Sequence, residues 1–264
     1  MKILETIIAA KKEEVKKLRS EYRYSDFSES EFFNRDKLSL SRALTVNSSI
    51  AIIAEIKKAS PSAGLLKNNF NHREIAETYM SHDVDAISIL TDQPFFQGHI
   101  SYLKDIAQIK TVPILRKDFT IDAYQIYQSK ANGADAILLI AEALSKNQIK
   151  ELTEAAKEVD LETLLELHSE EQISKIDFKS NPIIGINNRN LDDFSVQIAT
   201  TLELAKILPE SSIIVSESGI HKQEDINSLK QTTTRAILVG EHLIKSTDLG
   251  KAIDKLKLWC ANES

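Results

Sequence analysis

A short apolar run followed by a longer polar stretch recurs along this chain from residue 50 onward. The runs are rich in isoleucine, valine and leucine, and their starts lie roughly 21 to 36 residues apart. That interval fits one strand, one helix and two short loops. The pattern therefore predicts eight strands, at residues 50–57, 86–91, 112–118, 136–141, 162–168, 183–189, 213–219 and 235–241.

The polar stretches between the runs have the composition of helices. Residues 73–83, 123–133 and 145–160 are examples, and Gly133 is placed to end the second of them. Alternating strands and helices imply parallel strands, and eight repeats predict a closed (β/α)8 barrel of the TIM type, in the α/β class. An open doubly wound sheet is the alternative, but residues 57–64, KKASPSAG, lack its G-x-G-x-x-G turn.

The first 48 residues do not follow this repeat. Their apolar positions form one stripe of a helix whose opposite face carries mixed charges, which predicts a helix packed on the barrel. A membrane-surface helix would have a more basic polar face. We expect a single domain over residues 1–264, with an N-terminal helical extension at 1–48 and the barrel at 49–264. The stripe consists of Ile3, Leu4, Ile7, Ile8, Val15 and Leu18.

Composition narrows the range of partners. The net charge of −6 weighs against nucleic acid, whose binding needs a concentrated basic surface. No apolar stretch reaches the roughly 18 residues of a membrane span, and the N-terminus lacks a signal-peptide pattern. The single cysteine, Cys260, excludes an internal disulfide framework and suits a reducing cytoplasm. We expect a cytoplasmic monomer without a fused partner, and an inert thiol at Cys260.

Charged and polar residues gather where the predicted strands end, which is where barrel enzymes build their sites. One buried charge could be a structural ion pair, whereas several from different strands indicate a site. Lysines and glutamates in a cavity shift one another's pKa values, as acid–base catalysis requires. Residues two apart on a strand share a face, which pairs Glu55 with Lys57, Lys117 with Phe119, and Asn187 with Arg189. The residues at the strand ends are Glu55, Lys57, Lys117, Glu166, Asn187, Arg189, Glu217 and Ser218.

Two further features concern ligands. The six histidines form no metal-binding motif, so we expect no metal, and only His168, two residues past Glu166, is a candidate for a direct role. The last two strands end in SESGI and LVGEHL, where glycine lets backbone N–H groups approach a phosphate. For either glycine taken alone, the need for a tight backbone turn is an equally good explanation. Both together favour a phosphorylated small molecule as the substrate.

These residues resemble the indole-3-glycerol phosphate synthase family of tryptophan biosynthesis. The resemblance covers residues 50 to about 244, and the N-terminal extension also fits. The motifs that carry it, in order along the predicted strands, are AEIKKASPSAG, ILTDQPFFQG, PILRKDF, LLELH, GINNRNL, SESGI and LVGEHL.

The resemblance implies a lyase that closes the indole ring of 1-(2-carboxyphenylamino)-1-deoxy-D-ribulose 5-phosphate, with loss of CO₂ and water and without a cofactor. It implies that Lys117 is a general acid at the ketose oxygen, that Glu166 is an acid–base group, and that Lys57 assists dehydration. Which lysine donates which proton stays open. The supporting site residues would be Glu55, Asn187, Glu217 and Ser218. Substrate and phosphate contacts would come from Ser60, Arg189, Gly219 and Gly240, and apolar walls from Phe96, Phe119 and Leu191.

Two other functions remain for comparison. The neighbouring pathway isomerase would use a cysteine at the end of the first strand, where this chain has Glu55 and Lys57. A non-catalytic phosphate sensor could keep the glycines and Arg189 but would not need Lys117 and Glu166 together. The segment SPSAG, after the first strand, is then a mobile loop that covers the substrate.

Overall fold

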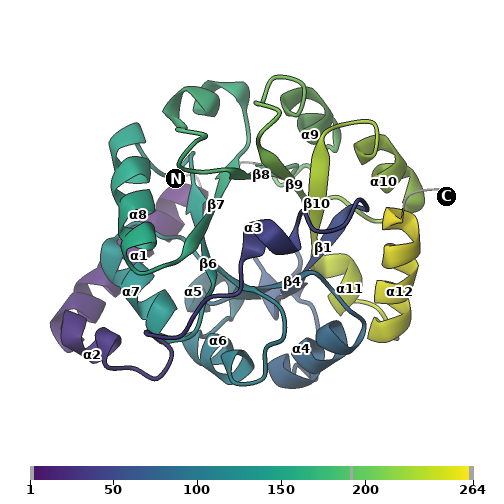
Figure 1. The fold of residues 1–264 in the computed structure, drawn as a ribbon. Coiled ribbons are helices and arrows are strands. Elements are labelled where there is room, and N and C mark those ends of the chain that lie inside the picture. The colour runs from purple at the N-terminus through teal and green to yellow at the C-terminus, as the bar shows by residue number, and fades with distance from the viewer. Residues whose placement is uncertain (1–2, 191–192, 262–264) are drawn as a thin grey trace.

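A computed structural model describes residues 3–190 and 193–261, and in this part of the chain eight parallel strands close into a barrel (Figure 1). The eight predicted strands and the barrel are confirmed, and the open doubly wound alternative is wrong. Around the barrel the strands follow the order β1-β10-β9-β8-β7-β6-β5-β4. Their bounds are β1 Ala51–Ile56, β4 Ala86–Leu90, β5 Ile114–Lys117, β6 Ala136–Ile140, β7 Glu162–Leu167, β8 Ile183–Asn187, β9 Ile213–Glu217 and β10 Thr234–Val239.

Helices surround the barrel in the order that the sequence pattern predicts. Gly133 follows α7 with a φ of +85°, a backbone conformation that glycine adopts without strain, so its predicted role in ending that helix is confirmed. The helices after the first strand are α4 His72–Ser81, α5 Gln93–Phe96, α6 Ile100–Ala107, α7 Ala123–Ala131, α8 Lys146–Glu158, the 3₁₀ helix η1 Glu170–Lys175, α9 Ala199–Leu204, α10 Gln223–Leu229, α11 Glu241–Ile244 and α12 Leu249–Cys260.

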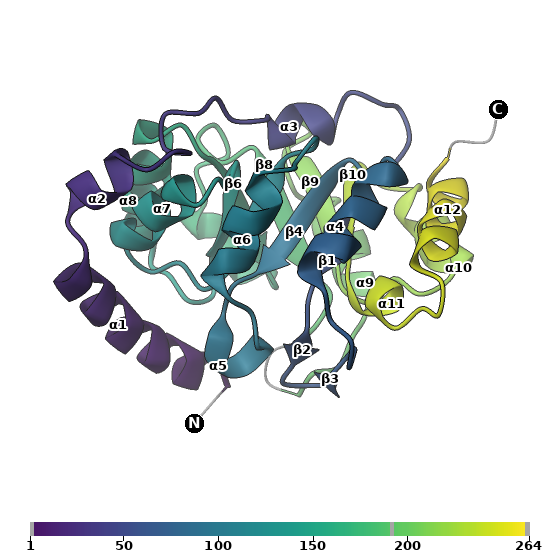
Figure 2. The same cartoon turned by 90° about the horizontal axis from the view of Figure 1, so that it is seen from below.

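In the described part of the N-terminal segment, residues 3–48, lie three helices, α1 Ile3–Glu21, α2 Tyr24–Ser28 and α3 Leu40–Ala43. Figure 2 shows α3 at one end of the barrel and α1 at the other, beside α5. At the first end, Ser39 and Ser41 donate hydrogen bonds to Glu162 at the start of β7. The predicted helix packed on the barrel is therefore confirmed as α1, and α3 covers the N-terminal ends of the strands. The domain boundary at residue 48 stays a prediction.

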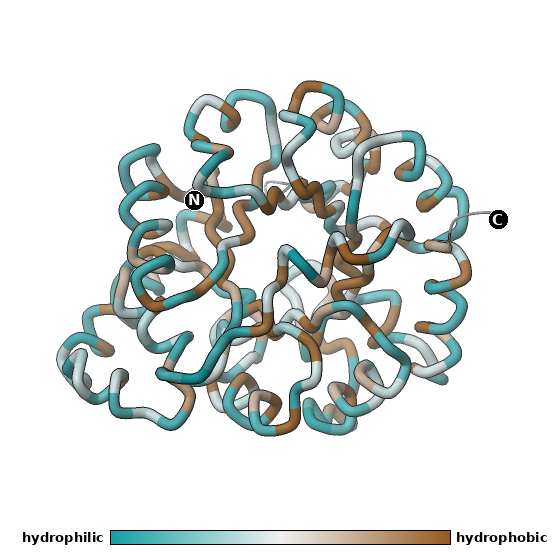
Figure 3. Tube along the Cα trace, viewed as in Figure 1, coloured by the Kyte–Doolittle hydropathy of each residue, from teal (hydrophilic) through white to brown (hydrophobic). Residues whose placement is uncertain are grey.

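Two apolar layers make the core, and their separation follows from the alternation of side chains along each strand. One layer fills the barrel and includes Ile53, Leu115 and Leu164. The other lies between the strands and the helices and includes Leu165 and Leu167. Figure 3 shows the apolar residues gathered on the strands and on the inner faces of the helices. Residues two positions beyond the inner layer therefore continue along the barrel axis toward its C-terminal end.

Cys260 is buried on α12, where burial raises the pKa of its thiol to about 12, and this agrees with the inert role expected of it. Within the described residues, no helix is long and apolar enough to cross a membrane.

Candidate active site

A cavity opens at the C-terminal end of the barrel, and nearly all the predicted site residues line it. Leu191 lies outside the described residues, so its predicted place in the apolar wall stays a prediction. The predicted residues that the structure brings together are Glu55, Lys57, Ser60, Phe96, Lys117, Phe119, Glu166, Asn187, Arg189, Glu217, Ser218, Gly219 and Gly240.

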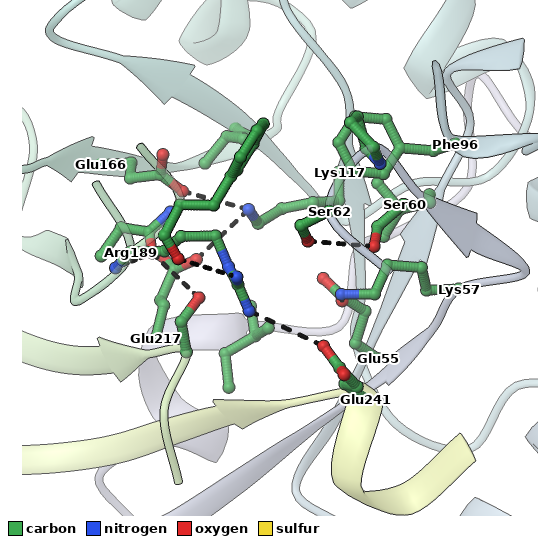
Figure 4. A pocket seen from close by; sticks show the side chains of 18 of the residues that line it. Glu55, Lys57, Ser60, Ser62, Phe96, Lys117, Glu166, Arg189, Glu217 and Glu241 are labelled. Carbon is green, nitrogen blue, oxygen red and sulfur yellow. Dashed lines mark hydrogen bonds and ion pairs between the residues drawn. The ribbon is translucent and has the colours of Figure 1, made fainter. Parts of the chain in front are cut away.

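The centre of this cavity is a lysine between two glutamates, shown in Figure 4. Lys117 Nζ, at the end of β5, lies 3.0 Å from Glu166 Oε2 and 3.2 Å from Glu217 Oε2. The inward series along each strand places them there, because Leu115, Leu164 and Val215 precede them by two residues on the same face. We call Lys117, Glu166 and Glu217 the site cluster.

The two glutamates of the site cluster have opposite pKa shifts. Burial by itself favours a raised pKa at both carboxyl groups, since Glu166 is 2% exposed and Glu217 is 1% exposed. At Glu166 the attraction of Lys117, assisted by His168, outweighs burial and lowers the pKa. At Glu217 burial prevails and the nearby Glu166 charge adds to it, so the pKa rises to about 8. A site with one ionised and one protonated carboxyl group can both accept and donate a proton near neutral pH.

Gly185, on β8, makes room for Glu217. A Cβ atom at this position would clash with Glu217 Oε1, which has no hydrogen-bond partner among the described residues. The predicted site residues did not include Gly185. Its position two residues before Asn187 on the inward face was the available signal.

A second ion pair lies at the end of β1, where Lys57 Nζ is 2.7 Å from Glu55 Oε1. The space that Glu55 occupies exists because Gly240 has no side chain, since a Cβ there would lie 2.6 Å from Glu55 Oε1. Beyond Lys57 the chain forms a small hairpin, β2 Ala59–Ser60 and β3 Gly64–Leu65, within the segment expected to be a loop. Ser60 lies 3.4 Å from Ser62 between their hydroxyl oxygens, and both line the cavity.

The turn after β9 has a backbone conformation that favours close approach to a ligand. Ser218 has a φ of +67°, which is uncommon for a residue with a side chain, and Gly219 has a φ of +78°. The Ser218 hydroxyl donates to Asn187 Oδ1 at 2.9 Å, which fixes the turn against β8. Nearby, Arg189 Nη2 lies 3.6 Å from Glu241 Oε2. The arginine is thus oriented toward the end of the cavity that Gly219 and Gly240 line.

The apolar wall includes a contribution from the N-terminal helix. Phe96 and Phe119 lie with ring centroids 6.1 Å apart. Ile3, Leu4 and Ile7 of α1 also line the cavity. The apolar stripe predicted that α1 packs on the barrel, but only the fold reveals that it reaches the site.

A buried lysine fixes α1 to this wall. Lys11 is 1% exposed, and its Nζ lies 2.9 Å from both Asp92 Oδ2 and Asp118 Oδ1. Asp118 also lies 3.1 Å from Arg116 Nη2. Asp92 accepts hydrogen bonds from the backbone N–H groups of Phe95 and Phe96, so the same carboxylate orients the aromatic wall. We call Lys11, Asp92, Arg116 and Asp118 the anchor cluster.

Sequence patterns also left several polar residues of the cavity unidentified. His221 and His242 line it near Gly219, with ring centroids 6.2 Å apart, and burial lowers the pKa of His242. Their signal was position alone, two residues beyond each of the two glycines. His168 lines an adjoining cavity instead of this one. Among residues 3–190 and 193–261, no three or more His, Cys, Asp or Glu side chains are grouped so that they could hold a metal ion.

Comparisons with known proteins agree with the motifs. A family model described as indole-3-glycerol phosphate synthase matches residues 4–256. A relative of that name from Priestia megaterium is 46% identical over 256 residues, which cover 96% of this chain and 97% of the relative. Another from Alkaliphilus metalliredigens is 43% identical, with 97% and 98% covered.

Solved structures support the fold alone. KGPDC from Streptococcus mutans has a TM-score of 0.63 at 11% identity, covering 81% of this chain and 98% of that one. The 3-hexulose-6-phosphate synthase from Salmonella typhimurium has a TM-score of 0.62 at 13% identity, covering 80% and 98%. The family model and the relatives, which extend over nearly the whole chain, decide the family. This chain belongs to the indole-3-glycerol phosphate synthase family.

Proposed function

We propose that this enzyme converts 1-(2-carboxyphenylamino)-1-deoxy-D-ribulose 5-phosphate into indole-3-glycerol phosphate, with loss of CO₂ and water. The observation that carries the proposal is the position of Lys117, whose ammonium group is held between two carboxyl groups at the end of the barrel that enzymes of this fold use. An aromatic wall of Phe96 and Phe119 lies in the same cavity.

In this mechanism Lys117 donates a proton to the ketose oxygen. Protonation makes the ketose carbon electrophilic enough for the aromatic ring carbon that bears the carboxylate to attack it and close the ring. Loss of CO₂ then restores aromaticity, and loss of water completes the indole. A positioned general acid contributes roughly 10²- to 10⁴-fold to such a step.

Glu166 takes and returns protons in these steps, because its lowered pKa leaves the carboxylate ionised at neutral pH. Lys57 assists the dehydration from the opposite side of the cavity, where its pairing with Glu55 fixes its ammonium group. Glu217, protonated below its pKa of about 8, adds a second proton donor beside Lys117. Asn187 and Ser218 hold the turn that borders this cluster.

The substrate phosphate lies at the end of the cavity bordered by Arg189, Gly219 and Gly240. The positive φ of Gly219 and its lack of a side chain permit backbone N–H groups to approach an anion closely. Ser60, on the β2–β3 hairpin, adds a hydroxyl group from the first loop. The protein as a whole is acidic, but screening over about 8 Å leaves the local cations to determine binding within the cavity.

The two alternatives explain fewer of these residues. An isomerase reaction that used a cysteine at the end of β1 has no such group, since Cys260 is buried on α12. A phosphate sensor would have no use for a lysine in contact with two buried glutamates. Burying these charged groups costs stability, and such clusters are typical of catalytic sites. We further propose that the enzyme acts as a monomer in the cytoplasm. This reducing compartment suits its single free cysteine.

The test is the appearance of indole absorbance and fluorescence when the purified protein is mixed with the carboxyphenylamino substrate. Glu166→Gln should lower kcat by roughly 10² to 10⁴ with little change in KM, because the amide keeps the shape but cannot exchange a proton. Glu154→Gln is the matched control, since this glutamate is exposed on α8. If the wild-type protein forms no indole product, the proposed reaction is wrong. A raised KM with unchanged kcat would make Glu166 a binding residue.

A further inference from the structure

His168 lies between two carboxylates, and both of its ring nitrogens lack a hydrogen-bond partner among the described residues. Its Nε2 is 3.5 Å from Glu166 Oε1, and its Nδ1 is 3.4 Å from Glu142 Oε2. The backbone N–H of His168 donates to Gln172 Oε1 at 2.7 Å, which holds the residue in place after β7. Buried polar atoms are normally paired, so two such atoms on one ring call for an explanation.

The second carboxylate oxygen of Glu166 explains the orientation of this ring. Lys117 occupies Oε2, on the side of the substrate cavity, whereas Oε1 faces His168. His168 thus contacts the proposed acid–base group from behind and does not border the substrate cavity. Any effect of His168 on the reaction therefore passes through Glu166.

Behind His168 lies a second cavity, of about 320 Å³, which has room for several water molecules. Glu142 borders it with a side chain that is 33% exposed, so this carboxylate can exchange protons with water. Asn187 and Arg189 line both cavities, which places the two side by side. The charged groups nearest the His168 ring are Glu166 from β7 and Glu142 after β6, and Arg189 after β8 lines the same second cavity.

We infer that His168 and Glu142 form a proton relay that connects Glu166 with the second cavity while the substrate fills the first. The inference rests on the proposed function of Glu166. Loss of CO₂ from the substrate carboxylate and loss of water together consume one proton, so the closed site must take up a proton from solvent while the substrate blocks the direct path. The relay supplies a separate path from the opposite side of the carboxylate.

The proton balance of the relay is simple. Water protonates the Glu142 carboxylate, Glu142 passes this proton to Nδ1 of His168, and the proton on Nε2 passes to Glu166. Glu166 ends protonated and can resupply the site, Glu142 returns to its ionised form, and His168 has exchanged one tautomer for the other. After the product leaves, exchange of the ring protons with water restores the starting tautomer. Both N···O distances exceed the usual hydrogen-bond length by about 0.5 Å, and such contacts often shorten when the substrate binds.

The experiment combines two replacements of His168 with chemical rescue. His168→Ala should lower kcat about tenfold with KM nearly unchanged, and added imidazole should restore kcat with saturation, most effectively at a pH where imidazole is neutral. His168→Gln, which keeps most of the volume but cannot relay a proton, should show the same loss. Glu142→Gln should lower kcat by only about threefold, since water can replace this exposed group. His82→Ala is the control, because His82 pairs with Asp254 at a distant surface position and its loss should leave kcat insensitive to imidazole.

Unchanged kcat in both His168 variants overturns the relay. A loss that imidazole does not restore, together with a raised KM or a lower melting temperature, makes His168 a packing residue and also overturns it. Glu166→Gln separates this failure from failure of the proposed function. If Glu166→Gln is inactive while the His168 variants turn over normally, only the relay is wrong, whereas a fully active Glu166→Gln removes the assigned role of Glu166 itself.

Discussion

The anchor cluster and the site cluster lie at the same end of the barrel and are both buried, yet they differ in charge balance. The anchor cluster sets two cations, Lys11 and Arg116, against the buried carboxylates of Asp92 and Asp118, and Lys11 also pairs at 2.7 Å with the more exposed Glu14. The site cluster sets one cation, Lys117, against two carboxyl groups. The two clusters are adjacent in sequence, since Lys117 stands between Arg116 and Asp118 and points to the opposite side of β5.

The pKa values express this difference. In the anchor cluster burial raises the pKa of Asp118, but Arg116 and Lys11 outweigh it and lower that pKa to about 2. In the site cluster the pKa of Glu217 rises to about 8, because burial and Glu166 together exceed the single lysine. Balanced charges fix their protonation and contribute to structure, whereas an excess carboxyl group keeps a proton available near neutral pH. Stability and proton transfer thus come from the same residue types in different ratios.

The largest effect is expected from Lys117→Ala. Removing the proton donor should lower turnover by roughly 10² to 10⁴, equivalent to about 3 to 5 kcal/mol in the barrier. The fold should persist, because Glu217 is already protonated near neutral pH and Glu166 can take up a proton as well. Steady-state kinetics and circular dichroism measure the two effects. More than a tenth of the wild-type turnover would contradict the role of Lys117.

Lys11→Met should act mainly on stability. It leaves the buried Asp92 without a cation among the described residues and Asp118 with Arg116 alone, and breaking a buried ion pair of this kind costs about 3 kcal/mol. The free energy of unfolding in urea measures this loss. KM should also rise, since α1 carries Ile3, Leu4 and Ile7 into the cavity. Lys12→Met, which changes the exposed neighbouring lysine, is the control. Equal stability of the two variants would show that the anchor cluster contributes nothing to the stability of the fold.

Asp118 of the anchor cluster and Glu217 of the site cluster should make stability respond to pH in opposite directions. Asp118, with a pKa lowered from 3.8 to about 2, contributes about 2 kcal/mol above pH 4, which is lost as the pH falls toward 2. Glu217, with a pKa raised from 4.5 to about 8, contributes stability below pH 4.5 that is lost as the pH rises to 8. Unfolding free energies between pH 2 and pH 9 measure both slopes. Asp118→Asn should flatten the acid slope alone and Glu217→Gln the upper slope alone, and the reverse pattern would refute the assignment.

A smaller effect is expected from Gly185→Ala. The added methyl group must displace the Glu217 carboxyl group or the Leu164 side chain, which should lower kcat about tenfold and cost about 1 kcal/mol of stability. The anchor cluster should not change. A double variant with Glu217→Gln checks the mechanism, because the two losses in kcat should not add if both act through Glu217. Additive losses would mean that Gly185 acts elsewhere.

Inorganic phosphate should have the smallest effect. As a competitive inhibitor it would bind near Arg189, Gly219 and Gly240, and at ten times its Kd it should stabilise the folded protein by about 1 kcal/mol. Inhibition kinetics and the melting temperature measure this. The rise should persist in Lys11→Met, whose change lies outside the phosphate end, and noncompetitive inhibition would place the phosphate site elsewhere. Gly219→Val is a poor probe of this site, because a Cβ there would lie 2.5 Å from Val196 on a backbone already at positive φ.

The eight strands, the barrel and the set of residues at its C-terminal end could all be predicted from the order of residues along the chain. This was possible because side chains alternate strictly along a strand, so Leu164 facing inward requires Glu166 to face inward too. The end of a parallel strand then gives the position of each polar group without knowledge of its neighbours. The predicted pairs of Glu55 with Lys57 and of Asn187 with Arg189 were correct for this reason.

Which charges meet, and what fills the space around them, could not be predicted in this way because it depends on how distant segments pack. Lys117 and Glu217 are 100 residues apart, and their contact depends on closure of the barrel, which no local period encodes. The same holds for Lys11, which reads as one of many lysines on an amphipathic helix until the fold buries it against Asp92 and Asp118. Spacing along a chain fixes the direction in which a side chain points. The pKa values depend on distance and burial, which exist only once the strands and α1 have packed together.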